Sequence, residues 1–329
     1  MSKGKAVKKQ PPQKTPLKKK QYKVRNWHEY NESLVRRGSL DFWVEQGIIK
    51  SWTVKIIPNK RKRGAQLKYS DHAIEGTCLV GKVYHQHLRQ AEGMMRSIVK
   101  QVGLNLEVPD YSTLSRRGGK ITIALPRKYK GKLIAILDST GLKVFGEGEW
   151  KVRKHGYSKR RTWVKMHISI DRDGEVRAAL ITDNAVDDAE AGVELLDQQR
   201  VDNVEEVDAD GAYDKSKFYD TCLEQNIGNI IIPPRKDAKI WVHGNRKGDP
   251  HPRDENLRAI RLSNRHKWKQ ATGYHKRSLV ETTMYRTKTI FGEKINSRNS
   301  NNQKTEVMLI LKALNLMTYN GMPDSYVVT

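Results

Sequence analysis

Residues 120–322 are predicted to form an α/β fold, a mixed five-stranded sheet flanked by helices. Residues 133–137 are an unbroken apolar run, which is typical of a central strand buried on both faces. From this run onward, the hydrophobic periodicity predicts the order strand, strand, strand, helix, strand, helix, strand, helix. Residues 26–119 carry mainly helical periodicity, so we expect a helical domain before the sheet, with an arm at 1–25 and a tail at 323–329.

The charge of the chain indicates a polyanionic partner. The 329 residues include 62 Lys or Arg and 37 Asp or Glu, a formal net charge of +25. Residues 1–25 hold ten of these cations, three prolines and no acidic residue, which is the composition of a disordered arm. Subtracting the ten cations leaves +15 on the remainder. A domain this basic usually binds nucleic acid.

Composition disfavours several other protein classes. No run approaches the roughly 18 apolar residues of a membrane span, and the N-terminus lacks the apolar core of a signal peptide. Cys78 and Cys222 stand far apart and outside any CxxC pair, which argues against a disulfide framework or a zinc site. We therefore expect a cytoplasmic protein without a membrane partner.

The helical region is predicted to begin at Trp27. Trp27, Tyr30, Leu34 and Val35 follow one another at helical intervals, and we expect these side chains in the core. A second short helix is predicted at about 39–47.

Residues 70–103 read as mainly helical, and 112–117 as a short helix that begins with hydroxyl residues and ends in Arg116 and Arg117. A helix, a turn and such a short helix are compatible with a helix-turn-helix that binds DNA. The basic segment 58–66 is either a solvated loop or a loop that contacts phosphates.

The first predicted strand of the sheet leads to a carboxylate. Asp138 directly follows the apolar run, and open α/β sheets place active sites at the carboxyl ends of such strands. An Asp that merely caps a turn is the alternative. The Gly-rich stretch after it holds candidate phosphate contacts, namely Lys143, Lys151, Arg153, Lys154, His155, Arg160 and Arg161.

The later elements complete the sheet. We predict two hairpin strands at 164–170 and 176–181 and two further strands at 204–210 and 230–232. Helices are predicted at 187–199 and 215–225, and a packing helix at 305–319. The polar stretch 235–272 is read as carrying three loop histidines without metal-ligand spacing. Three antiparallel strands followed by two parallel ones, wrapped by helices, are the order of an RNase H-like fold.

In such a fold the carboxylates come from the first strand, the fourth strand and a later helix. Asp138 falls on the first of these elements. Asp208 and Asp210 end the fourth strand on one face, because they lie two residues apart. The strand pattern leaves the choice between them open.

The third carboxylate is predicted on a helix at 274–288. At about 100° per residue, Tyr274, Arg277, Glu281 and Lys288 share one narrow stripe. A carboxylate flanked by cations suits a metal ion that faces a phosphodiester. The alternative is a solvated face on which Arg277 and Glu281 pair. A neighbouring apolar stripe can anchor the helix to the core through Val280, Met284 and Phe291.

The spacing Y-x-x-R-x-x-x-E-x-x-x-x-x-x-K resembles the third-carboxylate helix of the DDE transposases of bacterial insertion sequences. The strings NWHEYNESLVRRGSLDFW, YSTLSRR, DSTGLKVFGEGEWKVRKHG and DADGAYD are similar to transposases of the insertion sequence 5 family, 903-like branch. The resemblance runs from Trp27 to about Asn320. It implies a catalytic triad of Asp138, Asp210 and Glu281, since the family has its second Asp in the A-D-G-A-Y-D string.

The resemblance also implies the chemistry. The triad would hold two Mg²⁺ ions, for which Mn²⁺ can substitute. Water would free a 3′-hydroxyl at each transposon end, and that hydroxyl would attack target DNA. Arg277 and Lys288 are expected to position phosphates, and Tyr274 to bind a phosphate or stack near the terminal nucleotide. The implied partners are the terminal inverted repeats, target double-stranded DNA and a second copy of the chain, at the nucleoid of a bacterial cytoplasm.

Three other functions fit parts of the pattern. An RNase H-like nuclease without strand transfer would use the same metal site. A DNA-binding protein derived from a transposase would share the fold, although an intact triad argues against it. A basic packaging protein would not require so long an α/β pattern.

Overall fold

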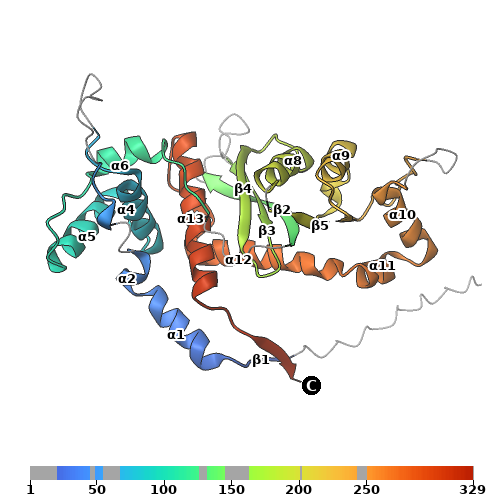
Figure 1. Cartoon of the computed structure of the whole chain (residues 1–329), viewed down its shortest axis with the longest axis horizontal. Helices are drawn as coiled ribbons and strands as arrows, with labels where there is room; N and C mark the ends of the chain where they lie inside the picture. The colour runs from blue at the N-terminus through green and yellow to red at the C-terminus, as the bar shows by residue number, and fades with distance from the viewer. Residues whose placement is uncertain are drawn as a thin grey trace, which may run out of the picture.

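The computed structural model describes residues 21–44, 49–54, 67–125, 132–144, 163–200, 202–242 and 250–328. Figure 1 shows a helical unit at one end, a sheet covered by helices in the middle and a pair of helices at the other end. The long helix α13 (Ser300–Asn320) stands between the helical unit and the sheet. Within the described ranges, no helix has the length and apolarity that crossing a bilayer requires.

The central sheet confirms the predicted α/β architecture. Its strands are β2 (Leu133–Val144), β3 (Trp163–Ile170), β4 (Val176–Asp183), β5 (Val204–Asp208), β6 (Asn229–Ile231) and β7 (Lys294–Ile295). The order is β4-β3-β2-β5-β6, antiparallel among the first three strands and parallel from β2 to β6. This mixed arrangement is consistent with an RNase H-like fold. The prediction missed β7, which adds to the far end of β2.

Helices cover both faces of the sheet (Figure 1). One face packs against α8 (Asp188–Gln198) and α9 (Ser216–Glu224), in a core that includes Leu137 and Val207. The other face packs against α12 (Ser278–Phe291) and α13. The predicted apolar stripe of α12 is confirmed, because Val280, Met284 and Phe291 are all buried.

Strand β2 is longer than predicted. The apolar pattern placed its end at Leu137, but β2 continues to Val144 because β3 pairs with it as far as Lys143. On its other side, β5 stops at Asp208, which lies opposite Ile136. Asp138 therefore lies in the middle of β2. The parallel pairing with β5 has ended before this residue, whereas the antiparallel pairing with β3 continues past it.

The helical unit consists of α1 (Trp27–Arg37), α2 (Leu40–Trp43), α4 (Asp71–Val83), α5 (Leu88–Gln101) and α6 (Tyr111–Gly118). The predicted start at Ser70 is confirmed, since its hydroxyl caps α4 by accepting from the Ala73 backbone N–H at 3.1 Å. Helix α6 is capped by Asp110 rather than by a hydroxyl residue. Residues 45–48 and the basic segment 58–66 lie outside the described residues.

One core crosses the predicted boundary after Gly119. Trp43, Ile74 and Leu114 of the helical unit share it with Leu309 and Met317 of α13. The neighbouring side of α13, which includes Val307, Leu311 and Leu314, packs on the sheet. A single helix thus forms part of both cores, so the helical unit and the sheet are packed as one body. The division at 119 stays a prediction.

The prediction that the apolar residues of α1 lie in the core is wrong for Trp27, Leu34 and Val35, while Tyr30 is half-buried. Trp27 is 60% exposed and Val35 63% exposed, and Leu34 is exposed as well. Helix α1 contacts the body through its polar side. Arg37 donates to the carbonyl oxygens of Met317 and Gly321 at 3.2 and 2.6 Å, and other polar contacts join Ser33 and Asn26 to the same segment. The apolar stripe therefore faces outward.

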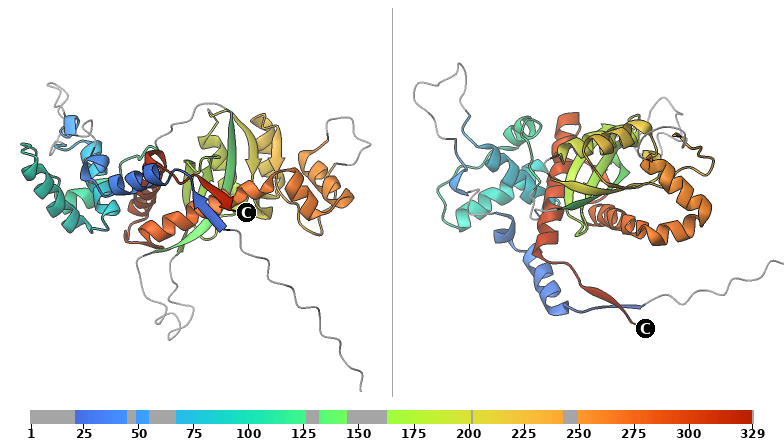
Figure 2. Two further views of the ribbon diagram at one scale, coloured as in Figure 1. Left: turned by 90° about the horizontal axis from the view of Figure 1, so that it is seen from below. Right: turned by 45° about the vertical axis from the view of Figure 1, so that its right-hand side comes forward.

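The two predicted tails meet as a ribbon. The last residues of the expected arm form β1 (Gln21–Val24), which pairs antiparallel with β8 (Ser325–Val328). Figure 2 shows this ribbon projecting from the body beside α1. Each segment is too short to be recognised as a strand from sequence alone, and the strand with which it pairs lies about 300 residues away along the chain.

The polar stretch 235–272 is partly helical, contrary to its reading as a loop. It contains α10 (Pro252–Leu262) and α11 (Arg265–Ala271), at the end of the molecule opposite the helical unit (Figure 1). His251 caps α10 and packs against Tyr219 and Trp241. His266 lies in α11, and His243 falls outside the described residues. Few apolar residues mark these helices, so their periodicity was weak.

Candidate active site

The three predicted carboxylates come from three elements. Asp138 lies on β2, Asp210 follows β5 and begins the 3-10 turn η1 (Gly211–Tyr213), and Glu281 lies in the first turn of α12. Ile136 pairs with Asp208 in the parallel ladder. Asp138 and Asp210 are each two residues beyond that pair, where β5 has ended, and both residues are partly exposed.

Arg277 joins two of these elements directly. It belongs to the 3-10 turn η2 (Tyr274–Arg277), which precedes α12. Its Nη1 lies 3.0 Å from Oδ2 of Asp138, and its Nη2 pairs with Glu281 one helical turn further on. The predicted pairing on a helix face is therefore present, but it includes a strand carboxylate 139 residues away in sequence. Sequence pattern alone could not distinguish these arrangements.

The site concentrates negative charge. Burial raises the pKa of Asp138, and the fields of Asp210 and Glu281 raise it further. The backbone N–H of Ser139, which donates to Oδ1 at 2.8 Å, and the Arg277 guanidinium act in the opposite direction. Burial alone would lower the pKa of Arg277, yet its acidic neighbours, Asp138 first, raise it above the ordinary value. Arg277 is thus a counterion to several carboxylates.

Asp210 and Asp208 lie in different environments. The side chain of Asp210 is partly exposed and accepts a hydrogen bond from the Ala212 backbone N–H at 2.8 Å. Asp208 is fully buried, and neither of its oxygens has a hydrogen-bond partner in the described part of the chain. Burial, with the nearby charge of Glu206, raises the pKa of Asp208 to about 7. Access to solvent therefore favours Asp210 as the group that meets a substrate.

The donor set fits a hard divalent cation in its chemistry. Mg²⁺ prefers carboxylate oxygens, and Asp138, Asp210 and Glu281 supply mutually repelling carboxylates whose charge is only partly balanced by Arg277. In their present positions, however, no three His, Cys, Asp or Glu side chains among the described residues form a group that could hold an ion. The ion pairs with Arg277 draw Asp138 and Glu281 toward the guanidinium.

Tyr274 is 9% exposed, which does not fit the expectation that its ring stacks on DNA. The ring packs against Trp268 with centroids 5.7 Å apart, in a small cluster with Ile231. Burial raises the pKa of its hydroxyl to about 12. This environment agrees with a packing role at the start of the helix, and the expected phosphate contact of Tyr274 stays a prediction.

Lys143 and Lys288 gather around one glutamate. Lys143 Nζ lies 3.0 Å from Oε2 of Glu293, and this hydrogen bond, together with the charges of Lys143 and Lys288, lowers the pKa of Glu293. Both lysines therefore lie near Glu293, close to the far end of β2. The other predicted phosphate contacts, Lys151, Arg153, Lys154, His155, Arg160 and Arg161, lie outside the described residues.

The paired arginines of α6 have different surroundings. Arg116 is exposed, and its guanidinium donates to the Ser112 hydroxyl at 2.9 Å. Arg117 instead pairs with Asp71 and donates to the backbone carbonyl of Tyr69, so it joins α6 to the start of α4. Only Arg116 keeps its side chain directed to solvent.

Sequence reasoning missed Tyr213 as a neighbour of the site. Its hydroxyl is buried without a hydrogen-bond partner among the described residues. Burial raises its pKa well above the ordinary value, and the charges of Asp188, Asp138 and Asp210 contribute. The string DADGAYD contains this tyrosine, but the strand pattern gave no reason to single it out.

Two family models match the chain. One is described as a transposase DDE domain and matches residues 129–316, which include Asp138, Asp210 and Glu281. A second model with the same description matches residues 35–147, from α1 to just past the end of β2. The first match spans more than half of the 329 residues.

Proposed function

We propose that this chain, which belongs to the DDE transposase family, binds the terminal inverted repeats of an insertion sequence and moves them into target DNA. It would cut each end to free a 3′-hydroxyl and then join that hydroxyl to the target by in-line transesterification. The family implies a divalent metal, generally Mg²⁺, and we propose two ions. The insertion sequence 5 family, 903-like branch, is the proposed subgroup on the strength of the Y-R-E-K spacing.

The observation that carries the proposal is the ion-pair bridge made by Arg277. It brings a carboxylate of β2 and a carboxylate of α12 to one guanidinium, at the end of the parallel strands where Asp210 emerges. A partly exposed cluster of carboxylates, in which burial raises the pKa of Asp138, is typical of a functional site. Three carboxylates on these three elements agree with the proposed triad.

Each side chain has a proposed role. Asp138, Asp210 and Glu281 would hold Mg²⁺, which supplies Lewis-acid polarisation of phosphate oxygens and charge neutralisation when bound. Arg277 then has its guanidinium available for a phosphate next to the scissile bond, since its planar fork suits phosphate oxygens. Lys288 and Lys143 would hold phosphates further along the DNA strand that contains the scissile bond. Tyr274 would fix the position of η2, and with it the position of Arg277, by packing.

We also propose that the helical unit binds double-stranded DNA. Helices α4, α5 and α6 would act as a helix-turn-helix, with Arg116 as a phosphate contact and Arg117 as a residue that orients α6. The lysine-rich arm would add salt-sensitive affinity, because each phosphate contact releases counterions.

A homodimer is proposed for holding two transposon ends. The exposed apolar residues of α1, Trp27, Leu34 and Val35, offer a surface of the kind that obligate dimers bury. Light scattering of the full-length protein, with and without DNA, would measure the mass. Trp27→Glu is expected to convert a dimer to a monomer, and an unchanged mass would exclude this surface as the interface.

The proposed activity is tested with supercoiled plasmid carrying the element's own ends, in the presence of Mg²⁺. Wild type is expected to nick at the ends and to join them to target DNA. Glu281→Gln is expected to bind the ends and to do neither. Cleavage without any joined product would favour a nuclease, and binding without cleavage by wild type would favour a DNA-binding protein.

A further inference from the structure

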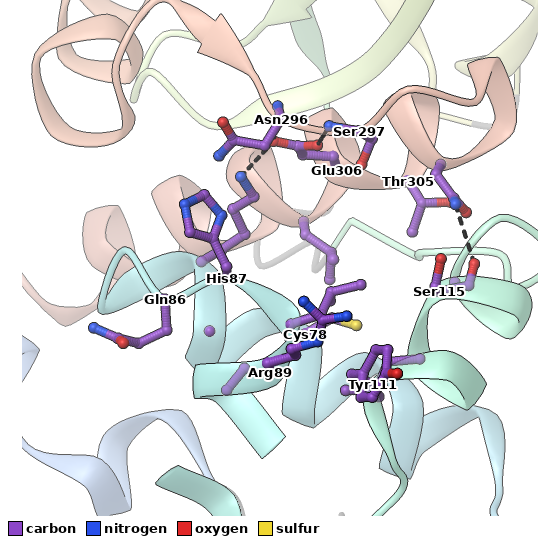
Figure 3. A pocket seen from close by; sticks show the side chains of 18 of the residues that line it. Cys78, Gln86, His87, Arg89, Tyr111, Ser115, Asn296, Ser297, Thr305 and Glu306 are labelled. Atoms are coloured by element: carbon purple, nitrogen blue, oxygen red, sulfur yellow. Dashed lines mark hydrogen bonds and ion pairs between the residues drawn. The ribbon is translucent and has the colours of Figure 1, made fainter. Parts of the chain in front are cut away.

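A cavity of about 680 Å³ lies where the helical unit meets α13 (Figure 3). One wall consists of residues 86–91, which are the turn before α5 and the first residues of α5, and a second consists of α6. Residues 296–299 and the first part of α13 close it from the side of the sheet. The cavity lies away from Asp138 and Glu281, and neither lines it.

The walls are fixed by interactions within the protein. Glu306 of α13 is buried, accepts hydrogen bonds from the backbone N–H groups of Asn296 and Ser297 at 2.9 and 2.8 Å, and pairs with Lys82 of α4 (Figure 3). Asn302 donates to the Ser115 carbonyl at 3.1 Å. These contacts shape the cavity before any ligand arrives, so a ligand would not have to order them.

Other polar side chains at the cavity have no such role. The side chains of Gln90 and Asn296 make no hydrogen bond or ion pair with the part of the chain that the structure describes. Among the described residues, the guanidinium of Arg89 has no hydrogen bond or ion pair, and its carbon lies 4.5 Å from the centroid of the Tyr111 ring. These groups remain available to a bound molecule.

The charge of the cavity suits an anion. Glu306 is the only acidic residue among its described lining residues, and Lys82 with two backbone N–H groups already balances it. Arg89 therefore gives the cavity a positive charge. Its guanidinium can bind a phosphate through two parallel hydrogen bonds.

The shape of the cavity and its apolar lining residues indicate which kind of anion it can bind. Cys78, Leu88, Ala91, Leu114 and Leu309 contribute apolar surface, and the ring of Tyr111 is 42% exposed beside them. A duplex backbone needs only a charged surface, whereas an unstacked base needs a hollow with an aromatic ring and amide groups for its edge. Tyr111 provides the ring, and Gln90 and Asn296 provide the amides.

We propose that this cavity binds one unstacked nucleotide of DNA, with the base against Tyr111 and the phosphate at Arg89. The inference rests on the proposed function, because that function makes DNA the bound polymer. A nucleotide held here contacts α5 and α6 of the helical unit and the 296–299 segment beside α13. It therefore ties bound DNA to both parts of the molecule.

The test uses the full-length protein without divalent metal. Binding of the four 2′-deoxynucleoside 5′-monophosphates is measured by calorimetry, with 2-deoxyribose 5-phosphate as the probe that lacks a base. At least one nucleotide is expected to bind about tenfold more tightly than the sugar phosphate. Tyr111→Leu should remove most of that difference, whereas Tyr111→Phe, which keeps the ring, should retain it.

Arg89→Gln should weaken the nucleotide and the sugar phosphate alike, by about tenfold. Arg96→Gln is the matched control, since Arg96 lies on the same helix but outside the cavity. Equal affinity for nucleotides and sugar phosphate would overturn the base site. Binding that is absent, or unchanged by Tyr111→Leu and Arg89→Gln, would overturn the whole proposal. Should either variant melt early, Gln90→Ala and Asn296→Ala replace it, and both should weaken only the nucleotides.

Failure of this inference can be distinguished from failure of the proposed function. Glu281→Gln should bind nucleotides as wild type does while failing to cut DNA. Wild type that cuts transposon ends but binds no nucleotide would refute the cavity alone. Nucleotide binding by a protein that never cuts would refute the proposed activity alone.

Discussion

Two regions of this molecule place three carboxylates around one arginine, and they differ in access to solvent. In the candidate active site, Arg277 pairs with Asp138 and Glu281 and interacts with Asp210, and the Glu281 side chain is 56% exposed. In the second cluster, Arg177 of β4 is 2% exposed. Its guanidinium lies 3.9, 3.4 and 3.8 Å from the carboxylates of Asp171, Glu175 and Asp202, respectively.

The second cluster belongs to the packing of the β3–β4 hairpin. Glu175 accepts a hydrogen bond from the Tyr319 hydroxyl of α13, and the neighbouring Val176 backbone exchanges two 2.8 Å hydrogen bonds with Asn315. DNA cannot reach these groups. The residue types in a cluster are therefore a poor guide to its function. In the accessible cluster the carboxylates can leave Arg277 to bind a metal ion, and Arg277 can then bind a phosphate.

The largest expected effect is the loss of DNA cleavage when a carboxylate of the accessible cluster is replaced. Asp138→Asn should lower end cleavage by about a thousandfold or more, because several kcal/mol of metal-dependent stabilisation would be lost at about 1.4 kcal/mol per factor of ten. Asp171→Asn, the same substitution in the buried cluster, should cut at the wild-type rate. The plasmid assay measures both. Equal losses in the two variants would contradict the assignment.

The next effect is on folding stability, and here the buried cluster is expected to be the more sensitive of the two. Arg177→Met should destabilise the protein by about 3–5 kcal/mol, because it leaves buried carboxylates without their counterion. Arg277→Met should cost about 1 kcal/mol or less, since its partners are partly solvated. Urea unfolding followed by circular dichroism compares them. A larger loss for Arg277→Met would show that the accessible cluster is the structural one.

A third effect depends on pH. Burial raises the pKa of Asp171 to about 6, above the ordinary value of 3.8. The folded state therefore holds this proton more tightly than the unfolded state, and the corresponding stability is present below pH 4 and lost as the pH rises toward 6. The expected loss is about 2–3 kcal/mol, from 1.36 kcal/mol per pKa unit.

Denaturant unfolding at several pH values measures this loss. Asp171→Asn should remove this contribution, so its stability should fall less than that of wild type between pH 4 and pH 6. Parallel curves for the two proteins would contradict the raised pKa.

The smallest expected effect is on thermal stability. Mg²⁺ at ten times its dissociation constant should stabilise wild type by about 1.4 kcal/mol, or about 2 °C in melting temperature for a protein of this size. A chelator should reverse the shift. Asp138→Asn should lose it and Asp171→Asn should keep it, so a shift that persists in Asp138→Asn would place the ion elsewhere.

Much of the sheet and of the helical unit could be predicted because these elements carry strong local signals. The run from Leu133 to Leu137, the turn before Gly174 and the cap at Ser70 each depend on residues near in sequence. The ribbon of β1 and β8 could not be predicted, since within the described ranges each strand pairs with the other and with no further strand. Helix α1 misled the prediction because its polar side, through Arg37 and Ser33, is the side that finds hydrogen-bond partners.

The sequence by itself determined the order of the sheet elements, the basic charge and the stripe that carries Arg277 and Glu281, because periodicity and spacing are local properties of the chain. Only the tertiary structure decided that Arg277 reaches Asp138, that Asp208 is buried and that Tyr274 packs inward. It also decided that α13 belongs to two cores at once. These features arise from contacts between distant segments, and solvent access at a site is the sum of such contacts.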